Sequence, residues 1–153
     1  MIQICHLFVS PGHNFVGHHG QEPESHPILE VDLIECVAGQ GIRGDRYFGF
    51  KPDFKGQITF FSMDVLDGLR RELHLPDVPP SATRRNVMVR GVDLNTLIGR
   101  EFEVQGVRMF GVEECRPCYW MNRAIGAGAE PWLQGRAGLR AKIMSDGVLR
   151  RAP

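Results

Sequence analysis

The chain has 153 residues, of which 42% are hydrophobic, so it is long enough for one domain with a buried core and too short for two of ordinary size. Its 18 basic and 18 acidic side chains balance, which excludes the strong positive charge of a sequence-independent nucleic-acid binder. No apolar run approaches the roughly 18 to 20 residues that span a bilayer. We therefore expect residues 1–153 to form a single cytoplasmic domain with neither nucleic-acid nor membrane partners.

Two strands and a long loop are predicted at the start of the chain. Residues 2–9 are apolar and β-prone, and residues 28–37 alternate apolar and acidic side chains with the two-residue period of a half-buried strand. Prolines and glycines leave the segment between them as a loop, and loops of that length are often functional. This loop carries four histidines, namely His13, His18, His19 and His26.

A third strand and one clear helix come next. Residues 57–61 have strand character, and Ser62 is the expected N-cap of the helix after them. The apolar side chains of that helix recur at helical spacing, at Val65, Leu66, Leu69 and Leu73.

The rest of the chain again favours strands. They are predicted over residues 85–89, 102–104, 107–112 and 139–144, with a hairpin at Gln105-Gly106 and a turn at Asp146-Gly147. Short helical turns are predicted at 93–98, 119–124 and 131–133. Because strands outnumber helices and do not alternate with them, the fold class is mostly β, and we expect a β-barrel with short helices in its connections.

The charge is unevenly distributed along the chain. Residues 1–42 hold five acidic and no basic side chains, whereas residues 116–153 hold seven basic and two acidic ones. The positive end would attract an anion, or the two ends would pair with each other across the fold. The sequence leaves both interpretations open.

A glycine-rich segment suggests a phosphate site. Gly39, Gly41 and Gly44 fit the pattern G-x-G-x-x-G, but the residues after them show no helical pattern, so a nicotinamide or flavin site is not expected. The backbone N–H groups of this segment would still suit a phosphate, with Arg43 and Arg46 adding positive charge. The alternative is a tight turn with an Arg–Asp pair at the surface.

The segment Cys115-Arg116-Pro117-Cys118 is the most informative for chemistry. Arg116 and the expected start of a helix after Pro117 would both lower the pKa of Cys118 and favour its reactive thiolate. The spacing also suits a redox pair or half of a zinc site, although the chain offers no second half, and two partly buried thiols are a further alternative. Four cysteines are too few for a disulfide scaffold, and we expect Cys5 and Cys36 to be buried and inert.

Two other groups of titratable residues have less specific interpretations. Adjacent histidines rarely bind one ion together, so we expect hydrogen bonding within the loop from His13, His18 and His19, with a proton donor or substrate contact as the alternative. Glu113 and Glu114 are expected to be a solvated pair, with a general acid as the alternative.

Several short blocks, taken in order, resemble those of the MOSC domain family, which is named after the C-terminal domain of molybdenum cofactor sulfurase. The blocks are Gly41-Ile42-Arg43-Gly44-Asp45-Arg46, Arg85-Asn86-Val87, Gly91-Val92-Asp93-Leu94, Gly99, Arg116-Pro117-Cys118, Gly135-Arg136-Ala137-Gly138 and Asp146-Gly147. The resemblance covers about residues 28–150. It depends on the order of several blocks more than on any one of them.

The resemblance implies a β-barrel that binds the molybdenum cofactor, a pterin dithiolene that ends in phosphate. Cys118 would ligate molybdenum or carry sulfur as a persulfide, and Arg46, Asn86 and Arg136 would help to shape the cofactor pocket. Arg43 is added to the candidate cofactor-binding residues because it lies in the glycine-rich segment. Arg116 is added because it lies between Cys115 and Cys118. The chain departs from the family at Arg85, where Glu often precedes the Asn, at its ending, and in having Cys115 and the histidine loop.

These residues support three functional hypotheses. The first is a molybdenum-cofactor enzyme with Cys118 as metal ligand, and the resemblance implies that it reduces N-hydroxylated small molecules, as family members related to the amidoxime-reducing enzymes do. A separate electron-donor protein is expected, because no flavin, haem or iron–sulfur motif is visible. The second is a sulfur carrier that receives sulfur from a cysteine desulfurase on Cys118, with Cys115 as the resolving thiol. The third is a non-catalytic module that stores or hands over the cofactor. None of them requires pyridoxal phosphate in this chain.

Overall fold

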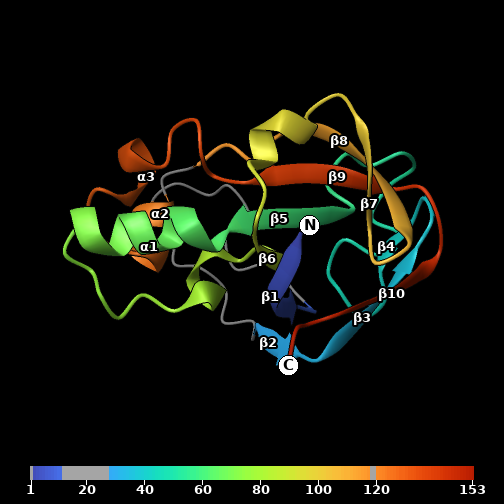
Figure 1. Ribbon diagram of the computed structural model, residues 1–153, viewed down its shortest axis with the longest axis horizontal. Coiled ribbons are helices and arrows are strands. Elements are labelled where there is room, and N and C mark those ends of the chain that lie inside the picture. Colours follow the sequence, from blue (N-terminus) through green and yellow to red (C-terminus); the bar gives the residue numbers. More distant parts are fainter. Residues whose placement is uncertain (1, 12–27, 118–119) are drawn as a thin grey trace.

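The computed structural model describes residues 2–11, 28–117 and 120–153 (Figure 1). The strands are β1 (Gln3–Val9), β2 (Leu29–Val31), β3 (Leu33–Val37), β4 (Gly41–Ile42), β5 (Ile58–Ser62), β6 (Val87–Arg90), β7 (Glu101–Val104), β8 (Val107–Glu114), β9 (Leu139–Ile143) and β10 (Gly147–Arg150). The helices are α1 (Met63–Glu72), α2 (Trp120–Ala124) and α3 (Ala129–Trp132), with 3-10 turns η1 (Pro80–Thr83) and η2 (Leu94–Leu97). The predicted predominance of strands is confirmed.

The strands form two sheets. Seven strands lie in the order β2-β1-β6-β5-β9-β8-β7, in which only β5 and β6 are parallel, and β10-β3-β4 form a smaller sheet. Within the described ranges neither sheet closes on itself, so the predicted barrel has to be corrected to two open sheets. The reason is local: the predicted strand 28–37 bends at Asp32, and its halves pair with different partners, β2 with β1 and β3 with β10.

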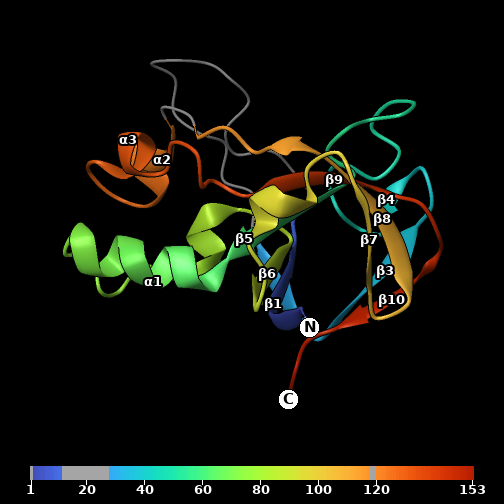
Figure 2. The same ribbon diagram turned by 45° about the horizontal axis from the view of Figure 1, so that its top comes forward.

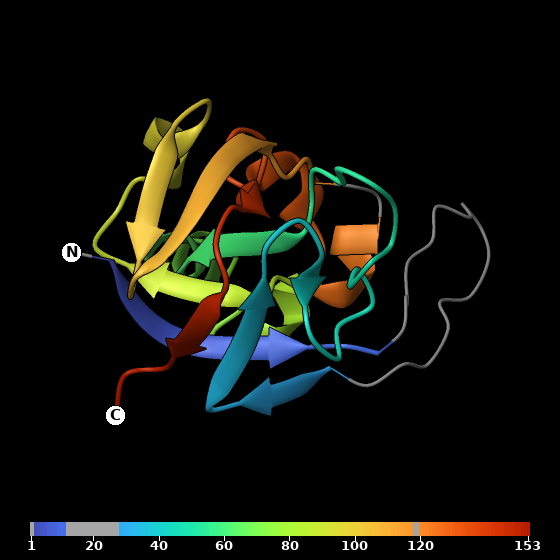
Figure 3. The ribbon, with the colours of Figure 1, turned by 90° about the vertical axis from the view of Figure 1, so that its right-hand side faces the viewer.

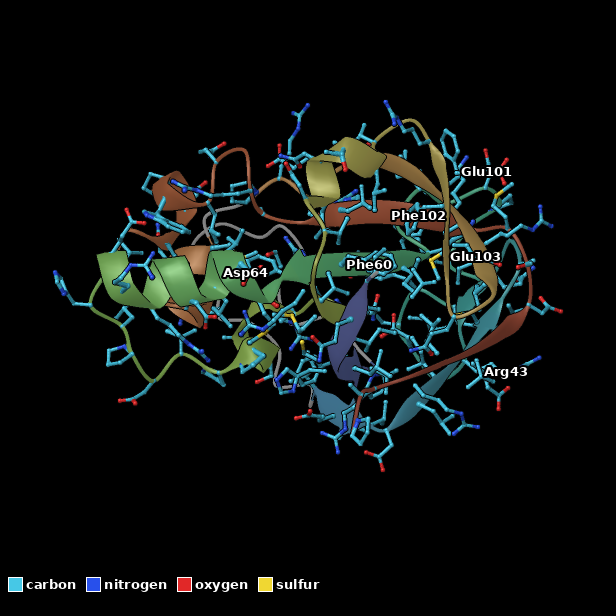
Figure 4. The ribbon with its side chains drawn as sticks, viewed as in Figure 1. Arg43, Phe60, Asp64, Glu101, Phe102 and Glu103 are labelled. Atoms are coloured by element: carbon cyan, nitrogen blue, oxygen red, sulfur yellow. The ribbon has the colours of Figure 1, made fainter. Side chains whose placement is uncertain are left out.

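The larger sheet curls strongly although it stays open. Phe102 on its edge strand β7 packs edge-on against Phe60 of the central strand β5, with ring centroids 5.7 Å apart (Figure 4). Such curling brings side chains of distant strands into one core without hydrogen bonds between those strands.

Strand β5 is buried on both faces and separates two hydrophobic clusters. Phe60 belongs to the cluster between the two sheets, and the next residue, Phe61, belongs to the cluster under α1, α2 and α3. Figures 1 and 2 show these helices at one end of the molecule and the smaller sheet at the opposite end. A continuous apolar strand is the expected sequence for a position buried on both sides.

Helix α1 begins where the sequence predicts. The Ser62 hydroxyl oxygen accepts a hydrogen bond from the backbone N–H of Val65 at 3.3 Å, and Leu66 and Leu69 are fully buried. With ten residues, α1 is the longest helix of the described chain, and none of the described helices is long and apolar enough to cross a membrane.

Other local predictions are confirmed as well. The hairpin between β7 and β8 turns at Gln105 and Gly106, both with positive φ, and the predicted helical turns appear as η2, α2 and α3. Two strands were not predicted. β4 has only two residues, and β10 begins at Gly147, inside the predicted turn.

The two ends of the chain pair with each other. The guanidinium of Arg151 contacts Glu30 at 3.1 Å and Asp32 at 2.7 Å, and the backbone N–H of Ala152 donates to the carbonyl of Ile4. The acidic beginning and the basic ending of the chain are thus partly neutralised by contacts across the fold.

Candidate functional site

Three of the sequence blocks meet at the turn of residues 84–86, which precedes β6, and the Cys115 segment is joined to them through Gly138. Arg46 Nη2 donates to the Arg84 carbonyl at 3.1 Å, and on the other side Arg85 Nε donates to the Ala137 carbonyl at 3.2 Å. The backbone N–H of Cys115 in turn donates to the Gly138 carbonyl at 2.8 Å. Figure 3 shows β1 running toward the loop that follows β4, which carries the first of these blocks.

Two partly buried guanidinium groups share one carboxylate at this point. The Arg46 side chain is 10% exposed, with Nη1 3.6 Å from Asp45 Oδ1, and Arg84 Nη2 donates to Ser10 Oγ at 3.0 Å. Asp45 also accepts a hydrogen bond from the backbone N–H of Ser10. Burial, followed by the positive charge of Arg46, lowers the pKa of Arg84 to about 10. Among the described residues, two guanidinium groups thus lie beside one carboxylate here.

Aromatic rings hold Arg46 in place. Its guanidinium lies 4.9 Å from the centroid of the Tyr47 ring, which in turn contacts the rings of Phe50 and Phe54. A guanidinium that is fixed in this way loses little conformational entropy when it binds an anion.

Asn86 connects three strands of the sheet. Its side-chain oxygen accepts from both the backbone N–H and the hydroxyl of Thr59, each at 3.0 Å, and its Nδ2 donates to the Phe8 carbonyl at 3.2 Å. With 2% of its surface exposed, Asn86 fixes the position of the 84–86 turn relative to β5.

A row of polar side chains continues from Asn86 across the sheet. Thr59 on β5 is paired in register with Arg140 on β9, and Arg140 is paired with Glu113 on β8, so these side chains lie on one face. Glu113 Oε1 lies 2.8 Å from Lys55 Nζ, and this hydrogen bond, followed by the charges of Lys55, Arg140 and Arg116, lowers the pKa of Glu113 against the opposing effect of burial. We call Asn86, Thr59, Arg140 and Glu113 the polar row.

Arg43 does not join this arrangement. It is exposed and forms an ion pair with Glu35 of β3 at 3.1 Å, and Figure 4 shows it at the rim of the molecule, away from Phe60. This position corresponds to the alternative of a tight turn with a surface ion pair, except that the partner of Arg43 is Glu35 of β3 and not the expected aspartate.

Arg136 lines a separate cleft of about 460 Å³, between the start of α1, the loop 91–95 and residues 136–138. Its Nε donates to the Trp132 carbonyl at 2.7 Å, and its guanidinium lies 3.8 Å from the centroid of the Trp132 ring. Asp93 and Asp64 also line the cleft. Figure 4 shows Asp64 on α1. Arg136 is thus connected to the Cys115 segment through the backbone of residues 137 and 138, while its side chain faces another cavity.

The cysteines differ in their surroundings. Cys115 is 2% exposed, Cys36 is equally buried, and burial raises the pKa of Cys36 to about 12, whereas Cys5 is only half-buried. Arg116 is exposed. Cys118, His13, His18, His19 and His26 lie outside the described residues. In the part of the chain that is described, no group of three His, Cys, Asp or Glu side chains is arranged to hold a metal ion.

Several residues of this region were not predicted from the sequence, namely Ser10, Lys55, Thr59, Arg84 and Arg140. The alternation from Leu139 to Ile143 does indicate that Arg140 faces away from the apolar core. What it faces depends on strand register, which the sequence does not give.

Comparison with known proteins identifies the fold. The YuaD protein of Bacillus subtilis has a TM-score of 0.76 at 18% identity, with 98% of this chain and 92% of that chain covered. YiiM of Geobacillus stearothermophilus has a TM-score of 0.68 at 13% identity, with 98% and 71% covered, and YiiM of Escherichia coli has 0.63 at 16%, with 80% and 60% covered. Among curated proteins no match is found.

The family is established by the sequence itself. The model of the MOSC domain matches residues 18–150, which is most of the chain and includes every block that carries the resemblance. The chain therefore belongs to the MOSC domain family.

Proposed function

We propose that this protein binds the molybdenum cofactor beside the polar row, with Cys118 as the metal ligand, and that it reduces N-hydroxylated small molecules. Membership of the MOSC family, which is associated with this cofactor, gives the starting point. The observation that carries the proposal is the position of the 84–86 turn, which accepts a hydrogen bond from Arg46 on one side and contacts Ala137 on the other, next to the Gly138 carbonyl that binds the backbone N–H of Cys115.

The residues at this place fit the cofactor's chemistry. A phosphate needs fixed donors and positive charge, and Arg46 and Arg84 offer two guanidinium groups near the carboxylate of Asp45. Because both groups are partly buried, their attraction for an anion is screened less than at the open surface. Asn86 and Thr59 keep the turn that carries Arg84 rigid.

Each part of the chain has its own role in this proposal. When bound, the cofactor supplies a metal centre that takes an oxygen atom from the substrate, with electrons from a separate donor protein. A cysteine thiolate is a soft ligand that suits such a centre. The Arg46–Arg84 pair would orient the phosphate end.

The test is the molybdenum content of purified protein. The wild type and Cys118→Ser are produced in a host that makes the cofactor, with Cys5→Ser as the matched control at a half-buried position of β1. We expect molybdenum in the wild type and in Cys5→Ser, and loss of most of it in Cys118→Ser. Equal contents in all three, or none in any, would overturn the proposal.

A sulfur carrier is the competing outcome of the same experiment. It would show as a thiol-labile sulfur on Cys118, detected by mass spectrometry after incubation with a cysteine desulfurase, in protein that holds no molybdenum. The burial of Cys115 disfavours this route, because a resolving thiol has to reach the persulfide.

A further inference from the structure

Arg140 is a charged side chain for which the described part of the fold supplies no acceptor. It is half-buried on β9, in the middle of the polar row, and within the described residues it makes neither a hydrogen bond nor a direct ion pair. A guanidinium has five N–H donors, and burying them without acceptors costs free energy. Because the side chain is only half-buried and has no protein acceptor among the described residues, its donors are accessible to an anionic ligand.

The polar neighbours of Arg140 make their direct contacts with other groups. Glu113, its partner on β8, already forms the 2.8 Å ion pair with Lys55. Glu114, the next residue, uses a carboxylate oxygen to accept the backbone N–H of Ala137. On the other side, Thr59 donates its hydroxyl to Asn86. Three cations, Lys55, Arg116 and Arg140, thus surround Glu113.

We propose that Arg140 binds a carboxylate of the substrate, so that the protein acts on small molecules that carry an anionic group. Arg140 lies close to the Cys115 segment. In the pairing of β8 with β9, Arg140 is opposite Glu113 and Leu139 is opposite Glu114, the residue before Cys115. The guanidinium of Arg140 presents two parallel N–H groups, which match the two oxygens of a carboxylate. The Arg46–Arg84 pair belongs to the turn that Asn86 connects to Thr59, and the proposed function assigns the cofactor's phosphate to that pair. The assignment of the bound anion to the substrate, and not to the cofactor, rests on that proposed function. Anion binding by Arg140 is independent of it.

The first experiment uses the protein without cofactor. Acetate is titrated at low ionic strength, and the arginine side-chain Nε–Hε signals are followed by NMR. We expect the Arg140 signal to shift to saturation, and Arg140→Gln to weaken binding by roughly 10- to 100-fold, the value of a charge-assisted pair of hydrogen bonds. Arg43→Gln is the matched control, since Arg43 is exposed and paired with Glu35, and it should bind as the wild type does.

Two further variants test anion binding even if Arg140→Gln fails to fold. Arg140→Lys retains the charge without the planar fork and should bind more weakly than the wild type but more tightly than Arg140→Gln. Glu113→Gln removes the neighbouring negative charge and should tighten acetate binding by roughly two- to fivefold. A linear, non-saturating shift of the Arg140 signal, or unchanged binding in Arg140→Gln, would overturn the proposal.

The second experiment identifies the source of the anion. In cofactor-loaded protein, Arg140→Gln should keep its molybdenum and raise KM for an N-hydroxylated substrate that bears a carboxylate, but not for the same compound without it. Loss of molybdenum in Arg140→Gln would assign Arg140 to the cofactor's phosphate and contradict the substrate assignment. If the wild type holds no molybdenum, the proposed function fails, and the acetate titration still decides whether Arg140 binds an anion.

Discussion

At the scale of single residues, the surroundings of each arginine decide what it does. Arg43 and Arg46 are three positions apart in one glycine-rich block, yet Arg43 pairs with Glu35 at the surface while Arg46 is 10% exposed beside Asp45. The sequence identified both as candidates because their residue type and glycine neighbours are alike. It could not separate them, because the partners come from β3 and from the turn before β6.

The buried cysteine of β3 gives a pH prediction at the same scale. Burial raises the pKa of Cys36 from its ordinary value of 9.0 to about 12, so in this range the unfolded chain loses the thiol proton while the folded chain keeps it. The contribution of Cys36 to stability is therefore complete below pH 9 and is lost as the pH rises toward 12, by up to about 1.4 kcal/mol per pH unit.

Urea unfolding of the wild type and of Cys36→Ala between pH 8 and pH 12 checks this. We expect the variant to be less stable below pH 9 because a buried group is removed, and to lose less stability than the wild type above it. Parallel pH profiles for the two proteins would show that the thiol has no such influence.

At the scale of elements, local patterns predicted most strands and the one long helix. Runs of β-prone residues located β1 and β9, and the serine N-cap with apolar helical spacing located α1. The pattern failed where a choice of partner decides the structure. Residues 28–37 read as one strand, but the bend at Asp32 sends its halves to two sheets, and β10 exists only because β3 pairs with it. For the same reason the sequence did not reveal that Arg140 stands between Thr59 and Glu113.

The glycines that precede β9 provide a prediction for this element. At Gly138, with φ of +111°, an added Cβ would meet the Phe60 carbonyl oxygen at 2.3 Å, whereas at Gly135, with φ of +81°, it would meet nothing within 4 Å. Gly138→Ala must push the 135–138 segment away from β5 and should cost about 3 kcal/mol or more. Gly135→Ala meets only backbone strain, which costs about 1 to 2 kcal/mol.

Equilibrium unfolding of both alanine variants measures the difference. Because the Gly138 carbonyl accepts the backbone N–H of Cys115, Gly138→Ala should also lower the molybdenum content of loaded protein more than Gly135→Ala does. Equal destabilisation by the two substitutions would refute the close contact with β5.

At the scale of the whole molecule, the fold joins blocks that are far apart in the sequence. The larger sheet curls until β7 packs over β5, and Arg151 ties the end of the chain to Glu30 and Asp32. The 84–86 turn then lies between the Arg46 loop on one side and the 135–138 segment with Cys115 on the other. The residues of the proposed cofactor site come together only in the complete fold. For this reason the order of the blocks indicated the family, whereas no single block indicated a site.

The central claim is that Cys118 holds molybdenum beside the polar row. The most direct test is an anomalous difference map at the molybdenum absorption edge, from crystals of protein purified from a host that makes the cofactor. We predict one peak at bonding distance from Cys118 Sγ, on the side of the sheet that carries Thr59 and Arg140. A peak in the cleft lined by Arg136, or loaded crystals whose molybdenum lies away from Cys118, would contradict this claim.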